Sequence, residues 1–465
     1  MFDLNGKKIL VIGLARTGVA TSLFCAKHGA FVTAVDTRGE SELAEPVAKL
    51  RSNNISLKLG GYLPEILSGH HLVVPSPGVP ADSEILQAAR AQKIVVWSEI
   101  ELADRFLNGR LIGITGSNGK TTTTSLIEYI LKNAGFHTLL AGNIGTPLID
   151  VVEKTTDQTV TVAELSSFQL ELIETFRPNI SVFLNLTPDH LDRHGSMQAY
   201  AAAKARIFEK QTNADFAILN ADDPASTPYA PSKPKVFWFS RKQRVAQGAF
   251  LRGQEIVFRH DGKEEVILKQ SEIPLPGAHN LENVLAAVVA ASLAGASPAQ
   301  IANAIHSFAG VEHRLEFVTE HNGVRFYNDS KATNVDATLK ALDAFPGHIL
   351  IILGGKDKGS DYTILQTSLR EKAILALLIG AAAQKIESQI AGSVAIERAG
   401  TLGRAVEVAS HTARPGDIVL LAPACASFDQ FENYEHRGRV FKQLVHELTN
   451  RATHSTSNPM AMGKK

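Results

Sequence analysis

The stretch of the sequence most suggestive of chemistry is TGSNGKT, residues 115–121, which follows an apolar strand pattern and precedes a helical one. Glycines in such a loop let backbone N–H groups turn toward an anion, and the helix N-terminus adds partial positive charge. Lys120 can reach terminal phosphates, and the Thr121 hydroxyl can ligate Mg²⁺. The general pattern G-x-x-x-x-G-K-[ST] is not fully met, because Ile114 occupies its first glycine and Gly116 stands in its place. The loop predicts binding of a nucleoside triphosphate with Mg²⁺. By itself it is compatible with a switch GTPase, a kinase or a ligase.

Three side chains further along the chain could complete such a site. Glu164 ends an apolar strand pattern, and a carboxylate at that place can hold Mg²⁺, a cation that prefers oxygen ligands. His190, in the segment TPDHLD, follows another apolar strand expected over 180–186 and could ligate a metal or contact phosphate. Lys204 lies in a helical pattern. Each of the three is compatible with an ordinary structural role. The prediction of a metal and phosphate site therefore depends on their order along the chain and on their occurrence together with the phosphate loop.

A second glycine loop, GLARTG at 13–18, follows the first strand pattern and is typical of a dinucleotide-binding fold. Ala15 replaces the middle glycine of G-x-G-x-x-G, and its methyl group limits close approach to a pyrophosphate. Asp36 ends the next strand, where it could bind a ribose hydroxyl or a base edge. A dehydrogenase would use this layout, but hydride transfer needs no ATP. A nucleotide-linked sugar held by this first domain is the alternative.

Strand patterns alternate with helical patterns along the three units of the chain, which predicts an α/β protein with parallel sheets. We expect a Rossmann-like N-terminal domain over 1–108, a P-loop ATPase-like central domain over 109–309 and a Rossmann-like C-terminal domain over 310–450. The polar, aperiodic segment 451–465 is expected to be disordered.

Composition narrows the classes of partner. The chain carries 47 Lys and Arg and 47 Asp and Glu, so a broad basic surface for nucleic acid or membrane is excluded. No apolar run reaches the roughly 18 residues that a membrane helix needs. The two cysteines, Cys25 and Cys425, exclude a disulfide framework and offer no zinc spacing. We therefore expect a cytoplasmic protein with no nucleic-acid or membrane partner, and a monomer because no coiled-coil or large apolar surface pattern is present.

Longer motifs make the chain similar to the ATP-dependent Mur ligases of peptidoglycan synthesis, over about residues 7–448. The matching stretches are GSNGKTT (116–122), GNIG (142–145), ELSSFQLE (164–171), NLTPDHLD (185–192), AAAKARI around Lys204, HN (279–280), HRLE (313–316), NDSKATN (328–334) and PACASFDQF (423–431). The run of ELSSFQLE, NDSKATN and ACASFDQF favours the family member that adds D-glutamate.

The resemblance implies ligation of D-glutamate to UDP-N-acetylmuramoyl-L-alanine through an acyl phosphate, with ATP and two Mg²⁺ ions. A relative that adds another amino acid or makes folylpolyglutamate is the alternative, and a non-enzymatic nucleotide-binding switch is a further one.

The resemblance also implies roles for individual residues. The implied catalytic residues are Lys120, His190 and Lys204. The implied ATP contacts are Gly116, Ser117, Asn118, Gly119, Lys120, Thr121, Thr122, Asn280, Arg314 and Asp329. The implied substrate contacts are Arg16, Thr17, Asp36, Thr37, Arg38, Asn143, Lys331, Thr333, Lys358, Ser427 and Tyr434. The implied metal ligands are Thr121, Glu164, His190 and, as a carbamate, Lys204.

The chain departs from the family pattern at a few positions. Ala15 and Arg16 replace small or apolar residues, and Tyr434 stands where phenylalanine is frequent. In GGKDKGSDY, Lys358 is chosen over Lys356 by its spacing to Asp361.

Overall fold

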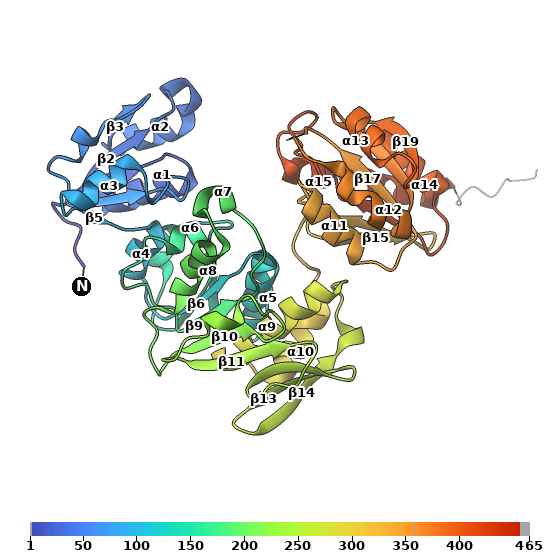
Figure 1. Cartoon of the computed structure of the whole chain (residues 1–465), viewed down its shortest axis with the longest axis horizontal. Coiled ribbons are helices and arrows are strands. Elements are labelled where there is room, and N and C mark those ends of the chain that lie inside the picture. The colour runs from blue at the N-terminus through green and yellow to red at the C-terminus, as the bar shows by residue number, and fades with distance from the viewer. Residues whose placement is uncertain (1, 358, 456–465) are drawn as a thin grey trace, which may run out of the picture. The chain divides into compact units, whose positions relative to one another are not determined.

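The structure is a computed structural model that describes residues 2–357 and 359–455. The chain divides into two compact units. The first runs up to Glu272 and also includes Leu281–Ser307, and the second comprises Ile273–Asn280 and the chain from Phe308 onward. The first unit holds two β-sheets and the second holds one, with the elements labelled in Figure 1.

The first sheet is wholly parallel, in the order β3-β2-β1-β4-β5. Its strands are β1 (Lys8–Ile12), β2 (Phe31–Asp36), β3 (Ser56–Leu59), β4 (Leu72–Pro75) and β5 (Val95–Val96). Its helices are α1 (Arg16–Lys27), α2 (Ala44–Arg51) and α3 (Glu84–Ala91). The apolar residues of β1 are all buried, as expected of a central parallel strand. The loop after β1 lies where the strand order reverses, which is the usual ligand position in such sheets.

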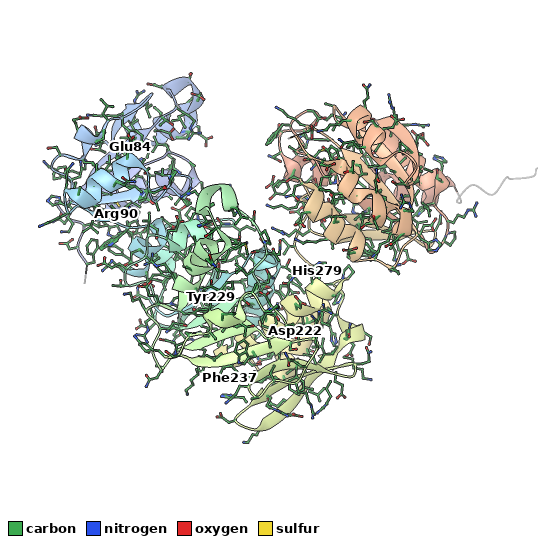
Figure 2. The ribbon with its side chains drawn as sticks, viewed as in Figure 1. Glu84, Arg90, Asp222, Tyr229, Phe237 and His279 are labelled. Atoms are coloured by element: carbon green, nitrogen blue, oxygen red, sulfur yellow. The ribbon has the colours of Figure 1, made fainter. Side chains whose placement is uncertain are left out.

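The second sheet has nine strands in the order β14-β13-β12-β11-β10-β9-β6-β8-β7. Its parallel part comprises β6 (Arg110–Thr115), β7 (His137–Gly142), β8 (Thr159–Glu164), β9 (Ile180–Phe183), β10 (Phe216–Asn220), β11 (Lys235–Ser240) and β12 (Gly248–Arg252). The strands β13 (Glu255–His260) and β14 (Lys263–Lys269) extend it antiparallel. Its helices are α5 (Lys120–Asn133), α6 (Ser167–Leu170), α7 (Leu191–His194), α8 (Met197–Ala205), α9 (Ala278–Ala294) and α10 (Pro298–Ser307). Phe237 of β11 is buried and packs edge-on against Phe216 of β10, with ring centroids 5.8 Å apart (Figure 2).

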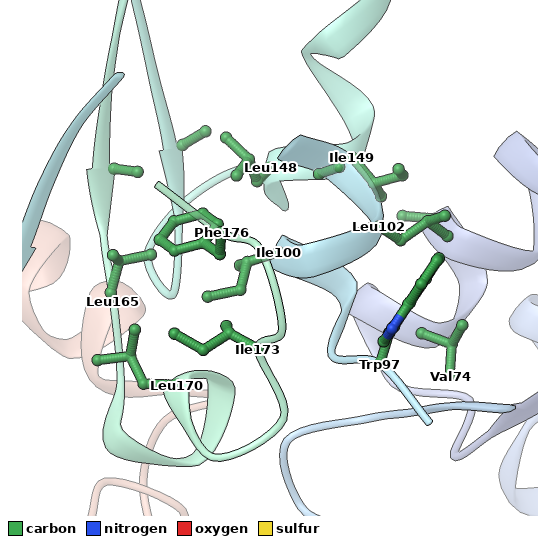
Figure 3. Close-up of a cluster of buried hydrophobic side chains, with 14 of the residues drawn as sticks. Val74, Trp97, Ile100, Leu102, Leu148, Ile149, Leu165, Leu170, Ile173 and Phe176 are labelled. Atoms are coloured by element: carbon green, nitrogen blue, oxygen red, sulfur yellow. The ribbon is translucent and has the colours of Figure 1, made fainter. Parts of the chain in front are cut away.

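The helix α4 (Glu99–Asp104) follows the first sheet and packs against the second. Trp97 and Ile100 belong to the same hydrophobic cluster as Leu148 and Phe176 of the second sheet's connections (Figure 3). The fully buried carboxylate of Glu101 accepts hydrogen bonds from the three backbone N–H groups of 174–176. These contacts join the two sheets of the first unit.

The sheet of the second unit has the order β15-β16-β20-β17-β18-β19, with β15 antiparallel and the rest parallel. Its strands are β15 (Glu316–His321), β16 (Val324–Asn328), β17 (Ile349–Gly354), β18 (Ala373–Ile379), β19 (Ala395–Gly400) and β20 (Ile418–Leu421). Its helices are α11 (Val335–Asp343), α12 (Gln366–Lys372), α13 (Ala383–Ile390), α14 (Leu402–Thr412) and α15 (Tyr434–Ser455).

The strand patterns expected before the two glycine loops and those expected to end at Asp36 and Glu164 are strands in the structure, whereas two segments differ from their expected bounds. The strand expected over 180–186 ends at Phe183, because the chain then turns to bond with the phosphate loop: Leu184 N donates to Thr115 O and Ser117 N to Asn185 O. The helix α15 continues to Ser455, into the segment expected to be disordered, whereas 456–465 lie outside the described residues. Within the described part of the chain, no helix is long and apolar enough to cross a membrane.

Candidate functional site

The phosphate loop joins the end of β6 to the start of α5, as the sequence predicts. Gly116 (φ +147°) and Gly119 (φ +81°) both adopt backbone conformations that favour glycine. A Cβ on Gly119 would lie 2.2 Å from Asn283 Oδ1, so the loop packs directly against α9. The N-terminus of α5 is thereby presented at the carboxyl edge of the sheet, where an anion can bind.

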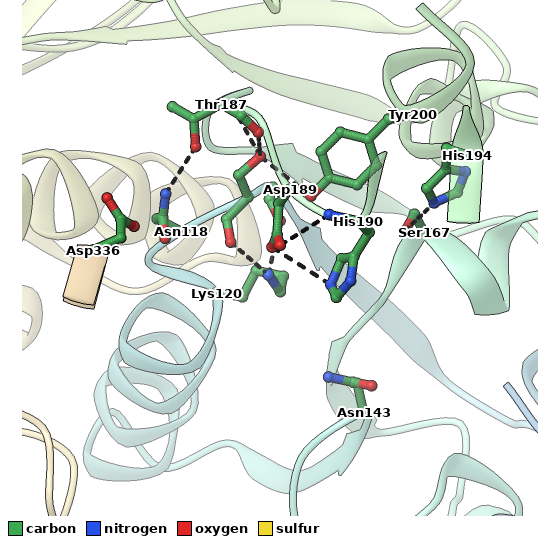
Figure 4. A network of polar contacts seen from close by, with 12 residues as sticks. Asn118, Lys120, Asn143, Ser167, Thr187, Asp189, His190, His194, Tyr200 and Asp336 are labelled. Carbon is green, nitrogen blue, oxygen red and sulfur yellow. Dashed lines mark hydrogen bonds and ion pairs between the residues drawn. The ribbon is translucent and has the colours of Figure 1, made fainter. Parts of the chain in front are cut away.

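The NLTPDHLD segment, which follows the neighbouring strand β9, forms hydrogen bonds with this loop (Figure 4). Asn118 N donates to Asn185 Oδ1 at 2.9 Å, and Asn118 Nδ2 donates to Thr187 Oγ1 at 3.0 Å. Ser117 Oγ donates to Thr187 O at 2.9 Å. The loop is therefore held in shape by side chains of its own unit.

Glu164 ends β8, which is paired to β6, so its carboxylate lies beside the first turn of α5. The side chain is buried and accepts from Thr121 Oγ1 at 2.8 Å and from Asn143 Nδ2 at 2.9 Å. A carboxylate and a hydroxyl side by side are oxygen donors of the kind that Mg²⁺ takes together with nucleotide phosphates. Among the described residues, no group of three or more His, Cys, Asp and Glu side chains forms a closed metal site.

Lys204 of α8 is buried, at 2% exposure, and its side chain contacts the phosphate loop. Its Nζ donates to Gly116 O at 2.8 Å, and Lys120 Nζ donates to the same carbonyl at 2.8 Å. Burial lowers the pKa of Lys204 to about 6, and the nearby Lys120 charge acts in the same direction. The amine of Lys204 is therefore mostly neutral at pH 7, the form that is nucleophilic.

His190 precedes α7 with a left-handed backbone (φ +53°), and about half of its side chain is exposed. Its ring lies 4.9 Å from the Phe168 ring between centroids, and its Nε2 lies 3.4 Å from Asp189 Oδ2. The His190 ring also lies near Tyr200, at 6.3 Å between ring centroids, and the Tyr200 hydroxyl contacts Ser117 of the phosphate loop (Figure 4).

The residues expected to hold a uridine nucleotide gather at the carboxyl edge of the first sheet. Asp36 accepts from Leu14 N at 2.7 Å and forms a two-pronged ion pair with Arg38, at 2.8 and 3.0 Å. Burial alone would raise the pKa of Asp36, but the bonds from Arg38 and Leu14 outweigh it and hold the pKa at about 2. Thr37 is exposed and Thr17 half-buried beside them. Arg16 Nη1 instead donates to Gly145 O at 2.5 Å, which links this loop to the GNIG segment.

The remaining expected ATP contacts, Asn280, Arg314 and Asp329, belong to the second unit. Asn280 Nδ2 donates to Pro276 O at 2.7 Å. Burial raises the pKa of Asp329 to about 7, and the charge of Arg314 offsets part of that rise. Arg314 is therefore close enough to Asp329 for its charge to act on the carboxyl group. Their joint use with the phosphate loop stays a prediction.

The expected amino-acid contacts that lie in the described residues also gather in the second unit. Lys331 Nζ donates to Tyr434 Oη at 2.8 Å and lies 4.2 Å from the Tyr434 ring centroid. Thr333 N donates to Lys331 O at 2.7 Å, and Ser427 is buried in the loop after β20. Lys358 lies outside the described residues.

Two residues of the site were not predicted from the sequence. Tyr200 Oη lies 3.2 Å from Ser117 Oγ, and its ring centroid lies 4.6 Å from Lys204 Nζ. The four-residue spacing of Tyr200 and Lys204 on one helical face was a usable signal. Asn283, whose Oδ1 accepts from Thr123 Oγ1 at 3.2 Å, lies 160 positions from its partner, and no local pattern points to it.

Three α/β bodies, one with a phosphate loop beside a buried glutamate, define a class of nucleotide-binding proteins. Family models match each body: the Mur ligase MurD-like N-terminal domain over 7–98, the Mur ligase middle domain over 114–291 and the Mur ligase glutamate ligase domain over 313–425. The chain belongs to the Mur ligase family.

Curated relatives resemble the chain over nearly its full length. A protein of Acidobacterium capsulatum named UDP-N-acetylmuramoylalanine--D-glutamate ligase is 53% identical, over 95% of this chain and 97% of its own. A protein of the same name from Koribacter versatilis is 51% identical, over 96% of this chain and 98% of its own.

Solved structures of lower identity share the fold. A MurF ligase from Thermotoga maritima in complex with ADP superposes with a TM-score of 0.59 at 16% identity, covering 96% of this chain and all of its own. MurC of Thermotoga maritima, a UDP-N-acetylmuramate-alanine ligase, gives 0.57 at 18% identity, covering 95% and 99%.

Proposed function

We propose that this protein joins D-glutamate to UDP-N-acetylmuramoyl-L-alanine at the expense of ATP, a step in the synthesis of peptidoglycan precursors. The observation that carries the proposal is the 53% identity, over 95% of the chain, to a curated relative named for this reaction. The phosphate loop supplies the ATP site that the reaction needs, and the dicarboxylate substrate suits the lysine and hydroxyl donors of the second unit.

The first chemical step activates a poor electrophile. A carboxylate oxygen of UDP-N-acetylmuramoyl-L-alanine attacks the γ-phosphorus of ATP, the bond between that phosphorus and the β–γ bridging oxygen breaks, and ADP leaves. The protein's contribution is positioning and neutralisation of charge, from the N-terminus of α5 and from Lys120. Asn143, whose amide already donates to Glu164 Oε1, is assigned to the substrate carboxylate and the transferred phosphate.

The donors around Glu164 fit a magnesium ion. Thr121 and Glu164 would hold it, and it would supply neutralisation of the phosphate charge when bound. We assign a second ion to His190 and to Lys204 in its carbamate form. Carbamylation suits Lys204 because the buried, mostly neutral amine can attack CO₂ and lose a proton, which replaces a cation with an oxygen donor.

The second step forms the amide bond. The amine of D-glutamate attacks the acyl carbon, a tetrahedral intermediate forms, the nitrogen loses its proton, and the carbon–oxygen bond to phosphate breaks. Lys331, Thr333, Lys358, Ser427 and Tyr434 are assigned to the amino acid and phosphate. Arg16, Thr17, Asp36, Thr37 and Arg38 are assigned to the uridine nucleotide, and Asn280, Arg314 and Asp329 to the adenine nucleoside of ATP.

We further propose that the enzyme acts as a monomer in the cytoplasm, where ATP is available. The domain bounds 1–108, 109–309 and 310–450 are proposed with it.

The test is the release of ADP from purified protein given ATP, Mg²⁺ and UDP-N-acetylmuramoyl-L-alanine, with one amino acid added at a time. Release with D-glutamate, and not with L-glutamate, L-lysine or diaminopimelate, is the expected result. Release with another amino acid would assign a different ligase activity.

A further inference from the structure

Arg437, in the first turn of α15, is the largest fully buried side chain among the described residues. Its hydrogen-bond partners among the described residues are the Ser330 hydroxyl and two backbone carbonyls rather than a carboxylate, and Asp429 acts on its charge from farther away. A lone buried guanidinium is costly, and an apolar side chain of similar size would fill the same volume at lower cost. Packing of the core therefore does not account for an arginine at this place.

The guanidinium joins two loops that are 95 positions apart in the sequence. Its Nε donates to Ser330 Oγ at 2.9 Å and its Nη2 to Ser330 O at 2.8 Å. Both Nη atoms donate to Cys425 O at 3.2 Å. One rigid, planar group thus fixes the loop after β16 against the loop after β20.

Neighbouring bonds make the same connection. Ser330 Oγ donates to Tyr434 O at 2.8 Å, so the loop after β16 is also tied to the start of α15. Ala424 adopts a left-handed backbone (φ +58°) and its N–H donates to Ala332 O at 2.9 Å. A non-glycine residue in that region is strained and persists where its surroundings fix it.

The two loops carry the groups assigned above to the amino acid. Lys331 follows Ser330 directly, and Ser427 lies two residues after Cys425. Burial lowers the pKa of Arg437 to about 10, so the side chain keeps its charge at neutral pH. A fixed positive charge bonded to both loops favours binding of an anionic ligand by those loops, because electrostatic attraction is stronger where water is excluded.

We propose that Arg437 is a positioning residue for the amino-acid pocket, which sets the distance between Lys331 and Ser427 and adds positive charge for a dicarboxylate. The inference rests on the proposed function, since it takes the amino acid to be D-glutamate.

The test compares Arg437→Met with Phe441→Leu, a matched control one turn further along α15. Phe441 is fully buried in the apolar core of the second unit and has no assigned role in the reaction. Both variants are purified at full length, and their thermal unfolding is recorded beside steady-state kinetics in each substrate.

Arg437→Met is expected to raise the KM for D-glutamate about tenfold or more, because a misplaced pocket loses charge-assisted hydrogen bonds. The KM for UDP-N-acetylmuramoyl-L-alanine is expected to stay within about twofold of the parent value, since that substrate's pocket is assigned to the first unit. Arg437→Lys, which keeps the charge without the planar fork, is expected between the parent and Arg437→Met.

Phe441→Leu is expected to lower the unfolding temperature and leave the KM for D-glutamate unchanged. An unchanged KM in Arg437→Met, or an equal rise in Phe441→Leu, would overturn the inference and leave the proposed function standing. Failure of the parent enzyme to use D-glutamate would instead overturn the proposed function.

Discussion

Replacing Asp329 by Asn should make the second unit more stable and the enzyme weaker in binding ATP. The carboxyl is 8% exposed and faces the charge of Arg314. Its pKa is raised from an ordinary 3.8 to about 7, so the stability that the protonated form provides is complete below pH 3.8 and is lost as the pH rises through about 7.

The size of this effect follows from the two pKa values. The raised pKa of Asp329 lowers the free energy of unfolding by about 4 kcal/mol at pH 8, where the carboxyl is ionised in both states, and by about 2 kcal/mol at pH 5, where only the unfolded chain ionises it. Asn has the same shape and does not titrate, and its carbonyl oxygen can still accept from Leu315 N. The stability gained by Asp329→Asn should therefore be about twice as large at pH 8 as at pH 5.

Hydrogen exchange of the β16 and β20 amides in rising urea measures this gain, because both tryptophans, Trp97 and Trp238, lie in the first unit and cannot report it. In parallel, the KM for ATP should rise at least about tenfold as an ionic hydrogen-bond acceptor is lost. No gain in protection at pH 8, or equal gains at both pH values, would refute the account of Asp329.

Three further substitutions test the other assignments. Lys120→Ala should abolish ADP release and keep the circular-dichroism spectrum of the folded protein. Lys132 is exposed on the same helix, and Lys132→Ala should leave the rate of ADP release unchanged. A near-normal rate in Lys120→Ala would remove Lys120 from the phosphate site. Lys204→Ala should lose activity and regain part of it in added acetate, which can replace the carboxylate of a carbamate; full activity with no additive would contradict that role. Asp36→Asn should raise the KM for the uridine substrate about tenfold by loosening Arg38, as measured at saturating ATP, whereas a change confined to the KM for ATP would refute this placement.

The sequence predicted the parts of the site that are local or that topology brings together. The phosphate loop is a contiguous motif, and Glu164 lies beside it because parallel β6 and β8 end at the same edge. The contact of Lys204 with Gly116 O spans 88 positions, and no periodicity in the chain encodes it. The same holds for the bonds of Arg437, which depend on how α15 packs against its own sheet.

The antiparallel strands β13, β14 and β15 were not predicted, since the chain was expected to form parallel sheets. The hairpin β13–β14 turns at Asp261-Gly262 and the hairpin β15–β16 at Asn322-Gly323, and all four residues have positive φ. Asp-Gly and Asn-Gly between β-rich runs are strong hairpin signals. Both signals were present in the sequence, but the alternation of strands with helices elsewhere in the chain favoured a purely parallel reading.

The proposed ligation is tested by measuring ADP release with UDP-N-acetylmuramoyl-L-alanine present and D-glutamate either added or omitted. We expect steady release only when ATP, Mg²⁺ and both other substrates are present, with one amide product formed for each ADP. Release that depends on neither the uridine substrate nor the amino acid would contradict it, and would leave this chain a nucleotide hydrolase.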